Sequence, residues 1–68
     1  MIGKNIMSLR KGRQMTQEEL AERIGVSRQA VAKWEAEETT PDLGSCCALA
    51  EVFGVALDSL VHYGDQGS

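Results

Sequence analysis

The chain of 68 residues lacks any long apolar stretch and contains a single proline. Its longest uninterrupted apolar run covers five residues, 46–50, whereas a membrane-spanning helix needs about 20. The early basic residues Lys4, Arg10 and Lys11 are not followed by an apolar segment, so we expect no secretory leader. Disordered linkers are usually richer in proline than this chain, which argues against such a segment. We therefore expect one small folded domain in the cytoplasm, with no membrane partner.

Candidates for metal binding and catalysis are also few. Two adjacent cysteines, Cys46 and Cys47, cannot build a disulfide framework, and structural zinc needs four ligands at characteristic spacings. The single histidine, His62, has no serine or cysteine placed for nucleophilic chemistry, and no phosphate-binding loop is present. We expect a reduced, buried pair of cysteines, no metal, no cofactor and no enzymatic activity.

Lysine and arginine are absent from the second half of the chain. All seven basic residues lie within residues 1–35, where the formal charge is +3, and residues 36–68 carry −6. The net charge of −3 alone argues against a nucleic-acid-binding protein. The uneven distribution instead indicates two surfaces with different roles, and chance clustering is the alternative.

Apolar residues recur at helical spacing throughout, which predicts five helices and no strands. The first ends near Arg13, and Thr16 with Glu19 forms a capping box for the second, which Gly25 ends. Ser27 caps the third helix. The predicted inner faces carry Ile2, Ile6 and Leu9, then Leu20, Ala21 and Ile24, then Ala30, Val31 and Trp34, then Leu43, Cys46, Ala50 and Phe53, and the fifth helix is marked by Leu57, Leu60 and Val61. We expect one domain over residues 1–64 and a polar tail over 65–68.

The tight turn at Gly25 joins the second and third helices as in a helix-turn-helix, whose second helix enters the major groove of DNA. The face of the third helix opposite Trp34 carries Arg28, Gln29, Ala32 and Lys33. Arginine or lysine pairs with guanine O6 and N7, and glutamine pairs with adenine N6 and N7. This face therefore suits base reading, although a merely solvated helix face has the same polarity.

The wider pattern resembles the Cro and phage-repressor family of helix-turn-helix domains, also called XRE-like, over residues 2–64. The matching segments are Leu9-Arg10-Lys11, residues 15–21, residues 24–29, Lys33-Trp34-Glu35, Pro41, Leu49-Ala50 and Phe53-Gly54-Val55. The resemblance implies a compact, all-α, five-helix domain of a transcriptional regulator. It also implies double-stranded DNA as the partner, usually a near-palindromic operator bound by a homodimer.

The resemblance and the residue pattern together assign roles to individual residues. The predicted base contacts are Ser27, Arg28, Gln29 and Lys33. The predicted phosphate contacts are Gln17, Arg10, Lys11 and Arg13. Arg10 also matches one half of an ion pair whose other half is Glu35, and we expect a partly buried brace there. Trp34 is expected in the core. A dimer is expected through the fifth helix and the end of the fourth, using Val55, Leu57, Val61 and Tyr63.

Some positions depart from the family pattern. Gln14 stands where a glycine commonly ends the first helix, and Gly44 lies unfavourably inside the fourth helix. Glu37 and Glu38 occupy a loop that commonly holds glycine or asparagine with a basic residue, and we expect them to repel DNA phosphates. Two other functions stay open. One is a protein-interaction domain without DNA binding, and the other is an antitoxin whose acidic half faces a basic toxin.

Overall fold

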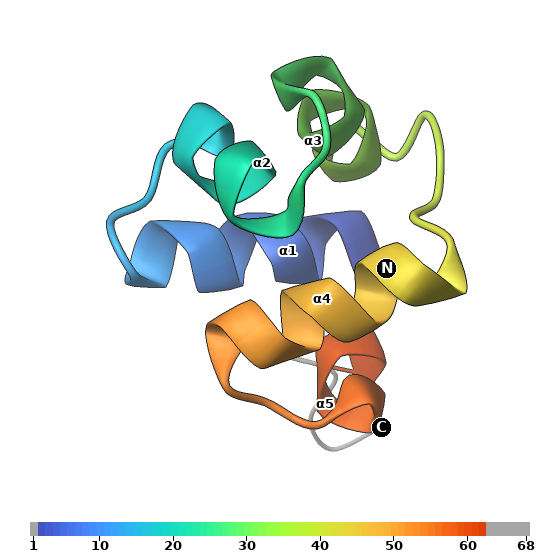
Figure 1. Ribbon diagram of the computed structural model, residues 1–68. Helices are drawn as coiled ribbons and strands as arrows, with labels where there is room; N and C mark the ends of the chain where they lie inside the picture. The colour runs from blue at the N-terminus through green and yellow to red at the C-terminus, as the bar shows by residue number, and fades with distance from the viewer. Residues whose placement is uncertain (1, 63–68) are drawn as a thin grey trace.

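A computed structural model describes residues 2–62 as five α-helices. The helices are α1 (Ile2–Gly12), α2 (Gln17–Ile24), α3 (Arg28–Glu35), α4 (Leu43–Phe53) and α5 (Leu57–His62). In Figure 1, α2 and α3 lie above α1, and α4 and α5 lie below it. The predicted five-helix, all-α architecture is confirmed over these residues. The predicted domain boundary at residue 64 and the tail lie outside the described residues.

Local side-chain contacts explain where α2 and α3 begin. The Thr16 hydroxyl accepts from the backbone N–H of Glu19 at 3.0 Å, and the Glu19 carboxylate accepts from the backbone N–H of Thr16 at 2.8 Å. This reciprocal pair is the predicted capping box, which satisfies two donors that a helix end leaves unpaired. The Ser27 hydroxyl likewise accepts from the backbone N–H of Ala30 at 3.1 Å. Both predicted starts are therefore confirmed.

Two helices end on a residue in the left-handed conformation that is not glycine. Gln14 follows α1 with φ 57°, and Glu37 follows α3 with φ 64°. In each case the next residue donates its backbone N–H to a carbonyl five residues earlier, Met15 to Arg10 and Glu38 to Lys33. This is the hydrogen-bond pattern of a Schellman motif. Gln14 thus takes the conformation that glycine commonly supplies there.

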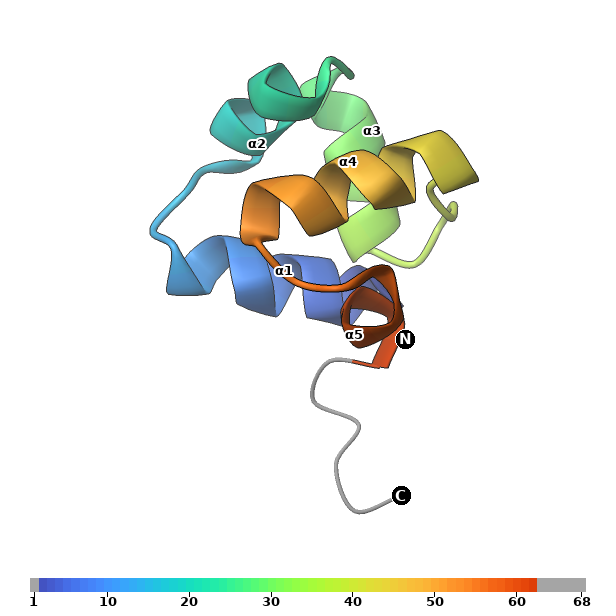
Figure 2. The same cartoon turned by 60° about the horizontal axis from the view of Figure 1, so that its bottom comes forward.

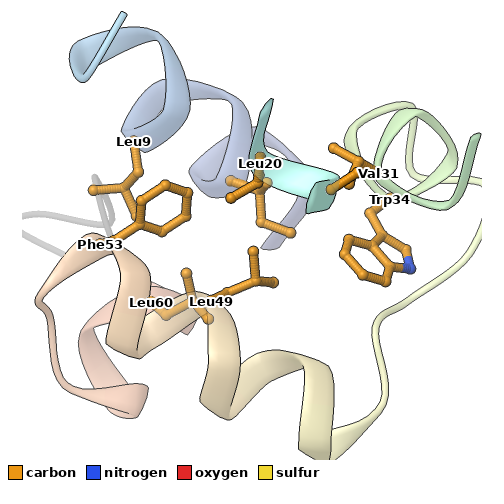
Figure 3. Close-up of a cluster of buried hydrophobic side chains, with 9 residues drawn as sticks. Leu9, Leu20, Val31, Trp34, Leu49, Phe53 and Leu60 are labelled. Atoms are coloured by element: carbon orange, nitrogen blue, oxygen red, sulfur yellow. The ribbon is translucent and has the colours of Figure 1, made fainter. Parts of the chain in front are cut away.

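Buried side chains from all five helices meet in one core. Figure 3 shows its labelled members, Leu9 from α1, Leu20 from α2, Val31 and Trp34 from α3, Leu49 and Phe53 from α4, and Leu60 from α5. Ile6 and Ala21 complete the cluster. The core therefore fixes α3 by its inner face and leaves the opposite face of that helix outside.

Two expectations drawn from the sequence are wrong in α4. Leu43 was expected on the inner face, but it is 71% exposed because the first turn of α4 projects beyond the other helices (Figures 1 and 2). Cys47 is also exposed, so the expectation of two buried cysteines is wrong for this residue. Cys46 is half-buried, and its burial, with Cys47 and Asp42 nearby, raises the pKa of its thiol.

A buried asparagine joins the two ends of the described chain. The amide nitrogen of Asn5 on α1 donates to the carbonyl oxygens of Leu60 at 2.9 Å and Val61 at 2.7 Å. Asn5 is only 7% exposed, and Figure 2 shows α5 beside the N-terminal part of α1. These bonds satisfy carbonyls of α5 that a short helix leaves without intrahelical partners. The sequence interpretation missed this contact, although Asn5 lies on the apolar stripe of α1 between Ile2 and Leu9.

Candidate nucleic-acid interface

The turn between α2 and α3 sets the angle at which α3 is presented. Gly25 has φ 78°, and the backbone N–H groups of Gly25 and Val26 both donate to the carbonyl of Ala21, at 2.8 and 3.0 Å. A residue with a β-carbon would be strained in this conformation. The turn therefore closes tightly enough for α2 and α3 to pack against each other, as the helix-turn-helix prediction requires.

The inner and outer faces of α3 differ sharply in burial. Val31 is fully buried and Trp34 is 6% exposed, so the predicted core position of Trp34 is confirmed. On the opposite face, Arg28, Gln29 and Lys33 are exposed. Because the buried face is held by the core, the exposed side chains are carried on a fixed helix.

The exposed residues of α3 surround a shallow depression. It is lined by Arg28, Gln29, Ala32, Lys33, Ala36 and Glu38. Two cationic side chains and an amide thus share one surface with a small residue, Ala32, which is half-buried. Such a surface supplies donors for guanine and adenine edges, and it lets a helix approach the floor of a groove. A carboxylate, Glu38, lies at the same surface.

A buried ion pair connects α1 to the end of α3. Arg10 Nε lies 2.7 Å from Glu35 Oε2, and a second Arg10 nitrogen lies 3.0 Å from Glu35 Oε1. The third donor, Arg10 Nη1, reaches the carbonyl of Met15 at 2.7 Å. The expected contact between the two residues is present, but it is more buried than expected, with the Arg10 and Glu35 side chains 11% and 1% exposed. These contacts draw the Arg10 side chain into the protein, where it forms the predicted brace.

Gln17 extends this ion pair to the outer surface. Its amide nitrogen donates to Glu35 Oε1 at 3.1 Å, and its amide oxygen accepts from Arg28 Nη1 at 3.5 Å. The side chain of Gln17 thus lies between the buried Glu35 and the exposed Arg28. Gln17 is also the first residue of α2, where backbone N–H groups favour an anion. The sequence placed Gln17 at this helix start but did not indicate its two side-chain partners.

The remaining predicted site residues occupy different surroundings. Lys11 is exposed in the last turn of α1. Arg13 is drawn to the C-terminal end of α4, where its guanidinium lies 5.3 Å from the centre of the Phe53 ring and donates to the Phe53 carbonyl. This position caps α4, a role that the sequence did not indicate. Ser27 is exposed at the start of α3, with its hydroxyl accepting the capping bond from Ala30.

Two kinds of feature are absent from the part of the chain that the structure describes. None of its helices is long and apolar enough to cross a membrane. Within residues 2–62, no group of three or more histidine, cysteine, aspartate or glutamate side chains is arranged to hold a metal ion.

Comparisons with known proteins agree with this geometry. A model of the helix-turn-helix family matches residues 6–60. The HTH-type transcriptional activator BcrR of Enterococcus faecalis is 39% identical over 56 residues, which make up 82% of this chain and 28% of BcrR. Across this activator and two further regulators, the chain spans between 28% and 59% of the relative's length.

Two solved structures of DNA complexes have the same fold. The P22 c2 repressor, crystallised with a synthetic operator, superposes with a TM-score of 0.84 at 32% identity, covering 88% of this chain and 91% of that one. SinR, a master regulator of biofilm formation crystallised with DNA, gives a TM-score of 0.83 at 29% identity, covering 90% of this chain and 98% of that one. The phage-repressor fold expected from the sequence is therefore confirmed.

Proposed function

The chain belongs to the helix-turn-helix family, and on this premise we propose that it is a sequence-specific DNA-binding domain of a transcriptional regulator. The observation that carries the proposal is the outer face of α3, where Arg28, Gln29 and Lys33 are exposed on a helix held by its buried opposite face. Double-stranded DNA with α3 in the major groove is the partner that suits this face. The family and the relatives are transcription regulators, so the proposed activity is binding in the cytoplasm rather than catalysis.

Within this proposal, base contacts come from Ser27, Arg28, Gln29 and Lys33. Phosphate contacts come from Lys11 and from the start of α2 at Gln17, where helix N–H groups face an anion favourably. The proposal does not retain Arg10 and Arg13 as phosphate contacts, because their guanidinium groups bind Glu35 and the end of α4. Their positive charge still contributes to the long-range attraction of DNA.

A selection of bound duplexes from a random pool tests this function. We expect a recovered site, and titration should show tighter binding to it than to a scrambled duplex of equal length. Arg28→Ala or Gln29→Ala should cost about 1–3 kcal/mol at the recovered site with the fold intact. Gln17→Ala should weaken binding to both duplexes about equally, because phosphates carry no sequence information. Failure to enrich any sequence would reject the proposal.

We also propose that the domain binds as a two-fold dimer through α5 and the end of α4. Two side chains on α5 remain accessible although they are apolar, Leu57 at 37% and Val61 at 43% exposure. Val55 beside them is half-buried, and the fourth predicted member of this surface, Tyr63, lies outside the described residues. A dimer would place two copies of α3 about 34 Å apart, one turn of DNA.

Sedimentation across a range of concentrations tests the dimer. We expect the parent to associate, weakly without DNA, and Leu57→Asp with Val61→Asp to sediment as a monomer because each carboxylate would be buried at the interface. Leu43→Asp, at the far end of α4, is the control and should leave association unchanged. A parent that stays monomeric at high concentration and binds one copy per recovered site would contradict the dimer.

The charge of −6 over residues 36–68 supports a second candidate function, in which an acidic surface binds a basic protein such as a toxin. The two functions make opposite predictions for the same variants. If protein binding is the function, reversing acidic charges of the second half, Glu51→Lys with Asp58→Lys, abolishes capture of the partner encoded by a neighbouring gene while Arg28→Ala has no effect. If DNA binding is the function, the pattern is reversed at the selected site.

A further inference from the structure

The two glutamates that follow α3 point to different parts of the molecule. Glu37 occupies the left-handed position at the end of the helix, and its backbone N–H donates to the carbonyl of Trp34 at 3.0 Å. Glu38 comes next, and its backbone N–H donates to the carbonyl of Lys33 at 2.9 Å. This closed turn fixes both backbones, and with them the positions of the two β-carbons.

The carboxylate of Glu37 lies against the start of α1. A β-carbon placed on Gly3 would come within 2.9 Å of both the carboxyl carbon and Oε2 of Glu37, and closer still to the carbonyl of Trp34. Gly3 therefore permits the close approach of this turn. The first turn of α1 carries no acidic residue of its own, and a carboxylate is stabilised beside helix N–H groups. Glu37 thus lies at a structural contact between α1 and the end of α3.

Glu38 instead faces the surface that we propose reads DNA. It lines the same shallow depression as Arg28, Gln29 and Lys33, and its side chain is exposed. When α3 lies in a groove, this depression faces the nucleic acid, and phosphates border it on both sides. A carboxylate at its edge would meet phosphates across water, whereas the carboxylate of Glu37, which is also exposed, lies beside Gly3 at the start of α1.

We propose that Glu38, and not Glu37, limits the affinity of this domain for DNA of any sequence through charge repulsion at the edge of the recognition surface. The inference rests on the proposed function. Non-specific binding depends almost wholly on phosphate neutralisation, so one repelling charge reduces it directly. Base contacts by the α3 side chains then contribute a larger fraction of the total binding free energy, so the preference for one site over another depends more on them.

Two charge-removing variants of equal size separate the glutamates. Glu38→Gln and Glu37→Gln each replace a carboxylate by an amide of the same shape, and thermal unfolding checks that both remain folded. The affinity of each for the recovered site and for a scrambled duplex is titrated at several salt concentrations. We expect Glu38→Gln to bind both duplexes about two- to fivefold more tightly than the parent at low salt, with the gain shrinking as salt screens the charges. Glu37→Gln should bind both duplexes as the parent does.

Other outcomes contradict the inference in distinguishable ways. Equal gains from the two variants would show that the direction of the side chain does not matter. Unchanged affinity in Glu38→Gln would show that its carboxylate does not meet phosphates. A loss confined to the recovered site would show that Glu38 accepts a hydrogen bond from a base, such as cytosine N4, instead of repelling phosphates. If the parent binds neither duplex, the proposed function itself is wrong, and the inference falls with it.

Discussion

The two parts of this domain share one apolar core but differ in charge and in the polar contacts that they add to it. In α1–α3, the capping box at Thr16 and the Arg10–Glu35 pair add directional polar contacts to the core that holds the helix with the proposed DNA-reading face. In α4 and α5, apolar side chains such as Leu49 and Leu60 fill the core from the other side. The first part is basic and the second acidic. From this comparison we infer that the shared core stabilises the fold, and that the polar contacts of α1–α3 in addition orient the proposed binding surface.

Breaking the Arg10–Glu35 ion pair is expected to have the largest effect and tests the role of polar contacts in α1–α3 most strongly. Glu35→Ala leaves the Arg10 guanidinium buried without its carboxylate, which we expect to lower the free energy of unfolding by about 3–5 kcal/mol. Urea unfolding followed by the fluorescence of the buried Trp34 measures the loss. A change below 1 kcal/mol would mean that the pair behaves like a surface salt bridge.

A paired replacement separates orientation from stability. In Arg10→Met with Glu35→Leu both charges are removed, and apolar replacement of a buried pair is often neutral or stabilising. We expect this variant to unfold at nearly the parent's urea concentration but to bind the recovered site more weakly, because Gln17 loses its Glu35 partner. Parental DNA binding would show that the ion pair does not orient the reading surface.

Two leucines of α4 test how much burial contributes to stability in the acidic half. Leu49 is fully buried, so Leu49→Ala should lose about 2–5 kcal/mol through lost burial and the cavity it leaves. Leu43 is 71% exposed, and Leu43→Ala should change stability by less than about 0.5 kcal/mol. Urea unfolding checks both. Similar losses from the two variants would contradict the burial seen along α4.

Sequence reasoning predicted the elements that rest on local signals. The capping box at Thr16, the cap at Ser27 and the two faces of α3 follow from residues within one helix turn, and the structure confirms them. Leu43 was misplaced because helical periodicity identifies an apolar stripe but not how far neighbouring helices extend along it. The position of α4 relative to the other helices depends on tertiary packing, which a local pattern does not contain.

The candidate site shows the same limit. Arg28, Gln29 and Lys33 were found because they share a face with the right hydrogen-bonding chemistry. The bonds of Gln17 to Glu35 and Arg28 join residues 18 and 11 positions apart, and no spacing rule predicts them. Arg13 reaches Phe53 across 40 positions, and no local pattern indicates that contact. Contacts between helices, which residue types do not reveal, determine where each of these side chains lies.

Helix ends give a smaller comparison between the halves. Gln14 after α1 and Gly54 after α4 both adopt the left-handed conformation, at φ 57° and 69°. Gln14→Gly should stabilise the domain by about 0.5–1 kcal/mol, because the steric cost of a β-carbon there exceeds the extra backbone entropy of glycine. Gly54→Ala should shift stability by a similar amount in the opposite direction. Thermal unfolding of both variants checks the signs, and a loss in Gln14→Gly would indicate that its side chain makes a stabilising contact.

The most direct measurement is the base-pair preference of Arg28→Ala at the recovered site. Every base pair of one half-site is changed in turn, and the affinities of the parent and the variant are titrated against each duplex at one salt concentration. If α3 reads the major groove through Arg28, the variant loses the parent's preference at one position, or at two adjacent positions, and keeps it elsewhere. A variant that is weaker on every duplex but keeps the parent's preference at each position would show that Arg28 contacts phosphate and that its proposed role in base reading is wrong.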